Sequence, residues 1–264
     1  MILVFIRLFS FSWFSLMCAV PTWAGDARTV LVLSIDALHP AALSEKITPT
    51  LHAMMRPGRY TLEGRSVDPP KTLIAHTAML TGLTPAQSGK QDNDWSPGLP
   101  RVIKPTLFHD AKRHGYRTAF YYAKPKLGYL VSGAVDEHGL APDDGIDKVS
   151  AFVRESGRRM AVLHVSGLEY AGADSGWLSP DYLEELTHID MALAPLFEQV
   201  RQRGAYAIVV TSDHGGHERQ HGTQDPEDFK LPLIIETNIA RVPKVRESIW
   251  RITELRKLVR GMLR

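Results

Sequence analysis

The chain has 264 residues, of which 44% are apolar, with a formal net charge of +2 at pH 7 and one cysteine. This composition is ordinary for a globular protein, and it excludes a disulfide-stapled scaffold because one cysteine cannot form an internal disulfide. Residues 241–264 carry eight Lys/Arg against two Glu, whereas residues 25–240 carry 22 basic against 27 acidic side chains. The main part of the chain therefore lacks the broad basic surface typical of nucleic-acid binding, and nucleic acid is not expected as a partner.

The first 24 residues have the pattern of a secretory signal peptide. Arg7 is the only charged side chain before Asp26, an apolar stretch runs from Leu8 to Val20, and small residues precede a cleavage position after Ala24. Cleavage would leave one cysteine-free domain, residues 25–264, in the periplasm or outside the cell. The alternative is an uncleaved membrane anchor, because residues 1–24 are just long enough to span a bilayer.

Along the chain, strand-like and helical segments alternate. Continuous apolar runs predict buried strands at Thr29–Ile35, Arg117–Ala123, Met160–Val165 and Ala207–Thr211. Helical periodicity predicts helices at Thr72–Thr81, Thr106–His114 and Tyr182–Arg203. Strands that are apolar on both faces indicate a mostly parallel sheet between helices, a three-layer α/β/α sandwich. The stretches 84–104 and 124–147, rich in Gly, Pro and Asp, are expected to be surface loops.

The basic C-terminal segment, residues 241–264, has an amphipathic pattern. Apolar residues recur at helical spacing, at Ile249, Ile252, Leu255, Val259 and Met262. We expect a helix docked on the domain; contact with an anionic membrane surface is the less favoured alternative.

Acidic residues follow three of the predicted strands. Asp36, Glu169 and Asp213 each lie at or just past a carboxyl end, where ligands bind in open α/β sheets. Three carboxylates gathered there would repel one another unless a cation neutralised them. The stretch 208-IVVTSDHGGHERQHGT-223 adds three histidines. The pattern therefore predicts a metal site at this edge.

Thr72 lies where the first long helix begins, after Pro69-Pro70. The pattern predicts that Thr72 is the N-cap of this helix. One interpretation is that Thr72 only caps the helix. The other is that Thr72 is a nucleophile, because a helix N-terminus stabilises negative charge and a nearby divalent cation lowers the pKa of a hydroxyl.

The arrangement of Asp36, Thr72, Asn93, Asp213-His214-Gly215 and His221 resembles the alkaline phosphatase superfamily, in particular its nucleotide pyrophosphatase/phosphodiesterase (type I phosphodiesterase) branch. The resemblance covers nearly the whole chain after residue 24. It implies that Asp36, Asp213 and His214 bind one Zn²⁺ and that Thr72 is the nucleophile bound to the same ion. It also implies that Asn93 holds the phosphoryl oxygens and that His221 binds a second zinc.

The sequence departs from the family pattern at the second zinc site. Glu169 stands where the family has an aspartate, and Ala173 stands where it has a histidine ligand. A glutamate can still bind zinc, but an alanine cannot. Either Asp174 or His217 supplies the missing ligand, or the second ion is weakly held or absent. His217 is more simply interpreted as a polar loop residue.

The signal-peptide pattern predicts export, and the resemblance implies a metal-dependent phosphoesterase that hydrolyses small-molecule phosphodiesters or nucleotide pyrophosphates through a phospho-threonine intermediate. The alternatives are a catalytically impaired metal- or phosphate-binding homologue and a single-ion hydrolase of phosphonate or sulfate esters. Lys71, Lys124 and Lys126 could contact an anionic substrate, but lone lysines are usually solvated surface charges. The remaining histidines are expected to be structural or exposed: His39, His52, His76, His164 and His188.

Overall fold

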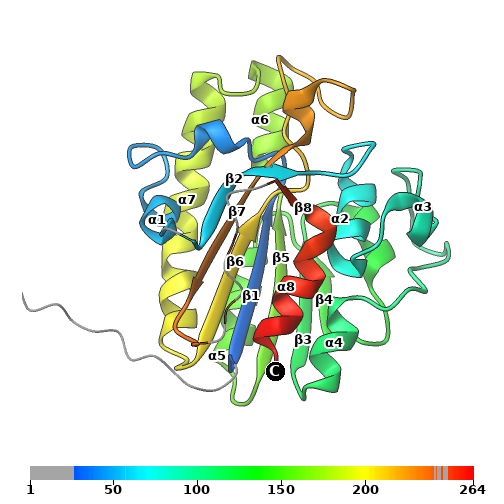
Figure 1. Cartoon of the computed structure of the whole chain (residues 1–264), viewed down its shortest axis with the longest axis vertical. Helices are drawn as coiled ribbons and strands as arrows, with labels where there is room; N and C mark the ends of the chain where they lie inside the picture. Colours follow the sequence, from blue (N-terminus) through cyan, green and yellow to red (C-terminus); the bar gives the residue numbers. More distant parts are fainter. Residues whose placement is uncertain (1–26, 57, 241, 243–244, 246–248) are drawn as a thin grey trace, which may run out of the picture.

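The computed structural model describes residues 27–56, 58–240, 242, 245 and 249–264. Its centre is one eight-stranded sheet with helices on both sides (Figure 1) and the strand order β4-β3-β5-β1-β6-β7-β2-β8. The strands are β1 (Thr29–Ile35), β2 (Tyr60–Arg65), β3 (Arg117–Tyr122), β4 (Glu137–Leu140), β5 (Arg159–Val165), β6 (Tyr206–Thr211), β7 (Lys230–Thr237) and β8 (Trp250–Arg251). The helices are α1 (Pro49–Met54), α2 (Thr72–Thr81), α3 (Pro85–Ser88), α4 (Leu107–Arg113), α5 (Gly145–Arg154), α6 (Gly167–Ser175), α7 (Pro180–Arg201) and α8 (Leu255–Met262).

The sheet separates two hydrophobic cores. On β1, Val30 and Val32 pack into the core that also contains side chains of α2, α4 and α8. The intervening Leu31 and Leu33 pack into the opposite core, with α1, α5 and α7. Successive side chains of a strand point to opposite faces, so a central strand must be apolar at every position. The predicted three-layer α/β/α architecture is thereby confirmed, and the four predicted strands and three predicted helices are each found within two residues of their expected bounds.

One strand of the sheet, β7, is antiparallel to its neighbours, which the sequence pattern did not predict. β7 runs antiparallel to both β6 and β2, while β1, β3, β4, β5 and β6 are parallel. β7 contains Pro232, and a proline within an apolar run argues against a central strand because it lacks an N–H. Here the β2–β7 pairing shifts register between Thr61 and Gly64, opposite Pro232, which accommodates the missing donor.

The two segments expected to be surface loops contain regular structure. Residues 84–104 include the short helix α3. Residues 124–147 include a 3-10 helix at Pro125–Leu130, the strand β4 and the start of α5. The loop prediction was wrong for residues 124–147 because Leu127 and Leu130 are fully buried despite the surrounding glycines and prolines.

The C-terminal segment docks on the domain with less helix than expected. α8 begins only at Leu255, because Trp250 and Arg251 pair with β2 as strand β8. Leu255, Val259 and Met262 are fully buried, whereas Ile249 is 56% exposed. The apolar side of α8 therefore packs into the core rather than facing outward.

The predicted signal peptide lies outside the described residues. Among the residues that the structure does describe, no helix combines the length and the apolar character that a membrane crossing requires.

Arg256 links α8 to the rest of the domain. Its guanidinium donates to the buried carboxylate of Asp110 at 2.7 and 3.2 Å and to the carbonyls of Thr81 (2.9 Å) and Pro105 (2.8 Å). We expect Arg256→Ala to lower the free energy of unfolding by about 2 kcal/mol, since the Asp110 carboxylate stays buried with one cation fewer. Chemical denaturation measures this loss. Lys257→Ala, at an exposed position of the same helix, serves as the control, and an equal loss in both variants would contradict the prediction.

Candidate metal centre and active site

Two aspartates lie side by side at the carboxyl edge of the sheet. Asp36 directly follows β1, and Asp213 lies two residues after the neighbouring strand β6. Both side chains are fully buried. The backbone N–H of Ala37 donates to Asp213 Oδ1 at 3.2 Å, while Asp213 Oδ2 and Asp36 Oδ1 have no hydrogen-bond donor among the described residues. Two buried carboxylate oxygens thus lack the partner that burial demands.

The Nε2 atom of His214 faces these two carboxylate oxygens. Its Nδ1 lies 2.7 Å from the Gly215 carbonyl oxygen and must donate to it, since a carbonyl only accepts. The neutral ring then has a bare Nε2, which lies 3.2 Å from Asp36 Oδ1 and 3.5 Å from Asp213 Oδ2. Burial disfavours protonation of His214, but the two carboxylates outweigh burial and raise its pKa. Three converging lone pairs need a cation, and two oxygens with one imidazole nitrogen form a donor set that suits zinc.

Gly215 allows this triplet to fit against the next loop. A Cβ atom at position 215 would lie 2.2 Å from the Glu227 carbonyl oxygen, so no larger residue fits without moving the backbone. The Asp-His-Gly order seen in the sequence therefore has a packing cause at its third position.

Asp36 also has a cationic partner on its other side. Asp36 Oδ2 lies 2.5 Å from Lys124 Nζ and 3.0 Å from His164 Nε2. The Ala123 N–H donates to His164 Nδ1, so Nε2 holds the ring proton and donates to the carboxylate. Burial alone would raise the pKa of Asp36, but Lys124, His164 and His214 lower it well below its usual range. Asp36 thus offers Oδ1 to a metal while Oδ2 is held by the protein.

Two of the histidines expected to be structural or exposed, His164 and His76, are buried and hydrogen-bonded beside the site. His164 orients Asp36, as described above. His76 is fully buried and bonds to the Thr72 carbonyl oxygen (2.7 Å) and the Ser34 hydroxyl (2.9 Å), and burial lowers its pKa to about 4. In the sequence, His164 is a polar residue within the apolar run of β5. A histidine in a buried strand needs a polar partner, and this signal could have indicated a role at the site. His39 is buried beside Glu227, whereas His52 and His188 are exposed.

Thr72 lies next to these groups, and its neighbour Lys124 was wrongly expected to be solvated. Thr72 is the first residue of α2 rather than its N-cap, which is Lys71. Lys124 Nζ donates to Thr72 Oγ1 at 3.2 Å and also pairs with Asp36 and Glu169. The Lys124 side chain is only 9% exposed. Because Lys124 lies two residues after β3, the strand-end argument applied to the acids could have found it.

Asn93 caps the helix that begins at Thr72. Its Oδ1 accepts the Leu73 N–H at 2.8 Å, which leaves the amide nitrogen of Asn93 as a donor. Lys90 holds this loop by donating to the Asp92 carboxylate (2.8 Å) and the Asp94 carbonyl oxygen (2.7 Å). Asn93 therefore lies beside Thr72 with its amide orientation set.

A second group contains Glu169, His214 and His221. His221 Nε2 lies 2.8 Å from Glu169 Oε1, and the His221 ring stacks on His214 with centroids 4.1 Å apart. Burial lowers the pKa of His221 to about 4, with the nearby His214 as a further cause. Ala173 and Asp174 are exposed on α6, and Asp174 is in neither candidate metal group of the described residues.

His217 also lies outside both groups. Its Nδ1 bonds to Asp228 Oδ1 at 2.7 Å, and Asp228 Oδ2 accepts the Thr223 N–H at 2.7 Å. The backbone carbonyl of Asp228 accepts the Gly215 N–H at 2.8 Å. Asp228 thus binds the loop next to His214, through Gly215, and next to His221, through Thr223. The bond between His217 and Asp228 helps to hold the same loop.

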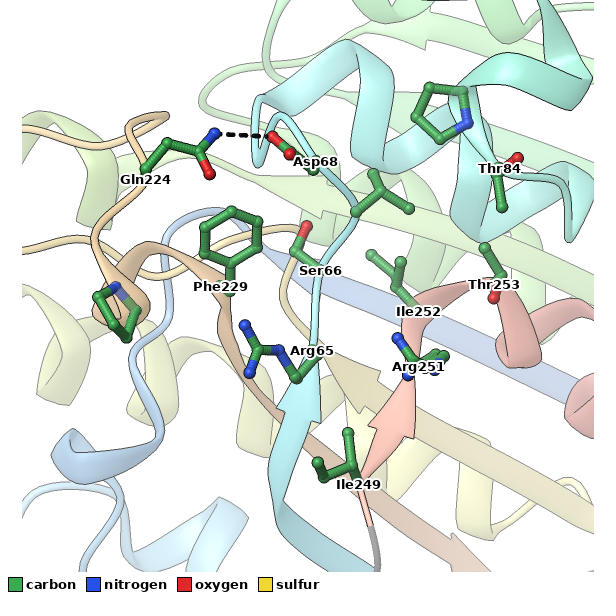
Figure 2. Close-up of a pocket in the computed structure, with 13 residues that line it drawn as sticks. Arg65, Ser66, Asp68, Thr84, Gln224, Phe229, Ile249, Arg251, Ile252 and Thr253 are labelled. Atoms are coloured by element: carbon green, nitrogen blue, oxygen red, sulfur yellow. Dashed lines mark hydrogen bonds between the residues drawn. The ribbon is translucent and has the colours of Figure 1, made fainter.

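A cavity of about 620 Å³ lies beside the site and contains no member of either metal group. Figure 2 shows Arg65 and Phe229 on one wall and Ile249, Arg251 and Ile252 on the other, with Gln224 bonded to Asp68 at one end. The hydroxyl of Ser66, which lines the cavity, donates to the Asp213 backbone carbonyl and so links the cavity wall to the centre.

A family model described as "Type I phosphodiesterase / nucleotide pyrophosphatase" matches residues 30–229. The chain belongs to this family, as the arrangement of Asp36, Thr72 and the Asp-His-Gly triplet indicated. A curated human relative, GPI ethanolamine phosphate transferase 2, catalytic subunit, is 22% identical over 227 residues. The match covers 78% of this chain but only 23% of the relative's length.

Solved structures with a similar fold include a protein in the alkaline phosphatase superfamily from Vibrio parahaemolyticus, with a TM-score of 0.61 at 13% identity, covering 92% of this chain and 68% of that one. Murine ectonucleotide pyrophosphatase/phosphodiesterase 5 superposes with a TM-score of 0.66 at 14% identity, covering 89% of this chain and 94% of that one. The C-terminal periplasmic domain of EptC from Escherichia coli, in a complex with Zn, gives a TM-score of 0.64 at 15% identity, with 90% and 84% covered. A 2-O GAG sulfatase is also among the similar folds.

Zinc is expected to stabilise the folded protein through Asp36, Asp213 and His214. At a free zinc concentration 100 times the dissociation constant, the gain is about 3 kcal/mol, measurable as a rise in the melting temperature that EDTA reverses. Asp213→Asn should remove this gain yet raise the stability of the EDTA-treated protein, because one buried charge is gone. Asp174→Asn, at an exposed position, is the control. An undiminished zinc effect in Asp213→Asn would contradict the assignment.

His217 is expected to contribute pH-dependent stability without binding zinc. The hydrogen bond to Asp228 raises its pKa despite partial burial. The contribution is therefore fully present below the unfolded value of about 6.5 and disappears as pH rises through the raised folded value. In EDTA-treated protein, the loss of unfolding free energy in His217→Gln should be larger in mild acid than in base. The zinc content of His217→Gln should equal that of the wild type; a reduced content would instead make His217 a ligand.

Proposed function

We propose that this member of the type I phosphodiesterase / nucleotide pyrophosphatase family is an exported, zinc-dependent hydrolase of phosphodiesters or nucleotide pyrophosphates, with Thr72 as its nucleophile. The observation that supports this most directly is the convergence of three unpartnered, buried ligand atoms, on Asp36, Asp213 and His214, near the Thr72 hydroxyl. Export rests on the signal-peptide pattern of residues 1–24.

Asp36, Asp213 and His214 would hold the ion. Zinc bound there would supply Lewis acidity, lowering the pKa of a neighbouring hydroxyl and offsetting negative charge on the phosphoryl group. The donor set and the zinc complex of the EptC domain, which has the same fold, support zinc as the metal.

Thr72 would form the covalent bond to phosphorus. After its hydroxyl proton has left to solvent, Oγ1 attacks phosphorus in line, and the bond to the leaving-group oxygen breaks as the new P–O bond forms. Lys124, which donates to Oγ1, stabilises the negative charge on that oxygen before the attack. Water then cleaves the phospho-threonine and restores the hydroxyl.

Asn93 and the start of α2 would hold the phosphoryl oxygens. Asn93 uses Oδ1 to accept the Leu73 N–H, so its amide nitrogen is the atom available to donate to a substrate oxygen. The N-terminus of α2 adds the positive end of its dipole. Donors aimed at developing charge typically contribute a factor of about 10² to 10³ in rate.

Diester and pyrophosphate substrates are supported by the family to which the chain belongs. The murine ectonucleotide pyrophosphatase/phosphodiesterase 5 has also been solved as an inactive threonine-to-alanine variant in complex with AMP. By analogy, we propose that a nucleotide monoester is one product of this chain, with Thr72 as the corresponding threonine.

A transferase is the second candidate. The curated human relative is an ethanolamine phosphate transferase, although this chain spans less than a quarter of its length. Transfer would use the same attack by Thr72, and an acceptor hydroxyl rather than water would then take the phosphoryl group. Product analysis separates the two acceptors.

Thr72→Ala should lower turnover of bis(p-nitrophenyl) phosphate by a factor on the order of 10³ or more, because the nucleophile is lost. Thr72→Ser should retain part of the activity. Zinc content of both variants should equal the wild type, since three other ligands remain. Acid-quenched wild-type protein, analysed by intact-mass spectrometry, should show the phosphorylated chain, and Thr72→Ala should not.

Parallel assays distinguish the alternatives. Faster turnover of p-nitrophenyl sulfate than of the diester would favour a sulfatase. An increase in turnover with added alcohol, yielding an alkyl phosphoester, would favour a transferase. Zinc binding without turnover of any ester, and without a phosphorylated chain, would contradict the proposed enzyme and favour a binding homologue.

A further inference from the structure

Lys124 places a buried ammonium where three functional groups meet. Its Nζ lies 2.5 Å from Asp36 Oδ2 and 3.2 Å from Thr72 Oγ1, and it is in close contact with Glu169 Oε2. These groups come from the ends of β1 and β3, the start of α2 and the first turn of α6. A cation at this position bridges the nucleophile and two carboxylates.

His214 can serve only one of the two candidate metal groups. It appears in both, yet its Nδ1 is committed to the Gly215 carbonyl oxygen at 2.7 Å. The single lone pair on Nε2 points toward Asp36 and Asp213, at 3.2 and 3.5 Å. An ion bound there uses the only free nitrogen of His214. The second group is then reduced to Glu169 and His221.

Two ligands are too few for a stable zinc site, which usually has three or four protein ligands. Position 173 cannot supply a third, because it is an alanine. It lies one helical turn after Glu169 on α6, where residues four apart share a face. Glu169 itself is already paired with Lys124 and, at 2.8 Å, with His221.

The charges balance with one ion. Asp36, Asp213 and Glu169 supply three negative charges at this edge of the sheet. One divalent cation and the Lys124 ammonium supply three positive charges. A second divalent cation would leave two excess positive charges and would lie against the ammonium at short range.

We propose that the Lys124 ammonium takes the place of the second divalent cation, so that this chain works with one zinc ion and a lysine. In this arrangement Lys124 is a catalytic residue, because it donates to the attacking oxygen of Thr72. The inference rests on the proposed zinc site of Asp36, Asp213 and His214, and it assigns a role to a residue outside the ligands.

Zinc content tests the proposal without reference to activity. After zinc loading and dialysis, native mass spectrometry of the wild-type chain should find one zinc ion. Ala173→His should still hold one, because the ammonium occupies the space. The double variant Lys124→Ala/Ala173→His should hold two, because Glu169, His221 and the new histidine then form a three-ligand site.

The outcomes separate this inference from the proposed function. No zinc in the wild type would overturn the metal centre itself. Two zinc ions in the wild type or in Ala173→His would overturn the role of Lys124 and leave the proposed hydrolase standing. One zinc ion in the folded double variant would also count against it.

A single-residue variant gives an answer even where the double variant does not fold. Lys124→Met should keep one zinc per chain and lose turnover of bis(p-nitrophenyl) phosphate on the order of 10²-fold, because Thr72 Oγ1 loses its cationic donor. Lys46→Met, at an exposed position, is the matched control and should retain wild-type turnover. Full activity of Lys124→Met with one zinc bound would overturn the proposal.

Discussion

Repulsion among three carboxylates at one edge of the sheet is the constraint on which the site depends. Asp36, Asp213 and Glu169 follow strands or begin the helix after a strand, and β5, β1 and β6 are neighbours in the sheet. Parallel strands bring their carboxyl ends to the same edge, so the backbone topology itself forces these acids together. Burial removes the water that would otherwise screen them. Cations are therefore required at the site, whatever the reaction.

The surrounding residues bind one oxygen of each buried aspartate and leave the other oxygen facing the candidate metal group. Asp36 faces the ligand group with Oδ1 and binds Lys124 and His164 with Oδ2. The Ala37 N–H and the Gly215 carbonyl orient Asp213 and His214 in the same way. On each of these three side chains, one polar atom is held by a protein partner and the other, the candidate metal ligand, has none among the described residues. Such orientation of ligands by a second layer is what makes a metal site selective and rigid.

Proteins similar to this chain are named for different chemistry: a phosphodiesterase/pyrophosphatase and a sulfatase among the similar folds, and an ethanolamine phosphate transferase among the sequence relatives. One fold can support these different reactions if each begins with attack by a side-chain nucleophile. The attacking group then stays constant, while the leaving group and the acceptor change. In the mechanism proposed for this chain, Thr72 would be that attacking group, at the start of α2, and the Asn93 side chain reaches the same helix end by accepting the Leu73 N–H.

The sequence by itself determined the buried strands, the three-layer architecture and the candidate ligands, because apolar periodicity and residue type are local properties of the chain. It also indicated Thr72 as the start of a helix, although Lys71 is the N-cap. Only the tertiary structure decided that β7 is a central antiparallel strand despite Pro232 and that His164 and Lys124 bind Asp36. These contacts depend on which strand ends become neighbours, and the order β4-β3-β5-β1-β6-β7-β2-β8 is set by long-range packing that no short window of sequence encodes.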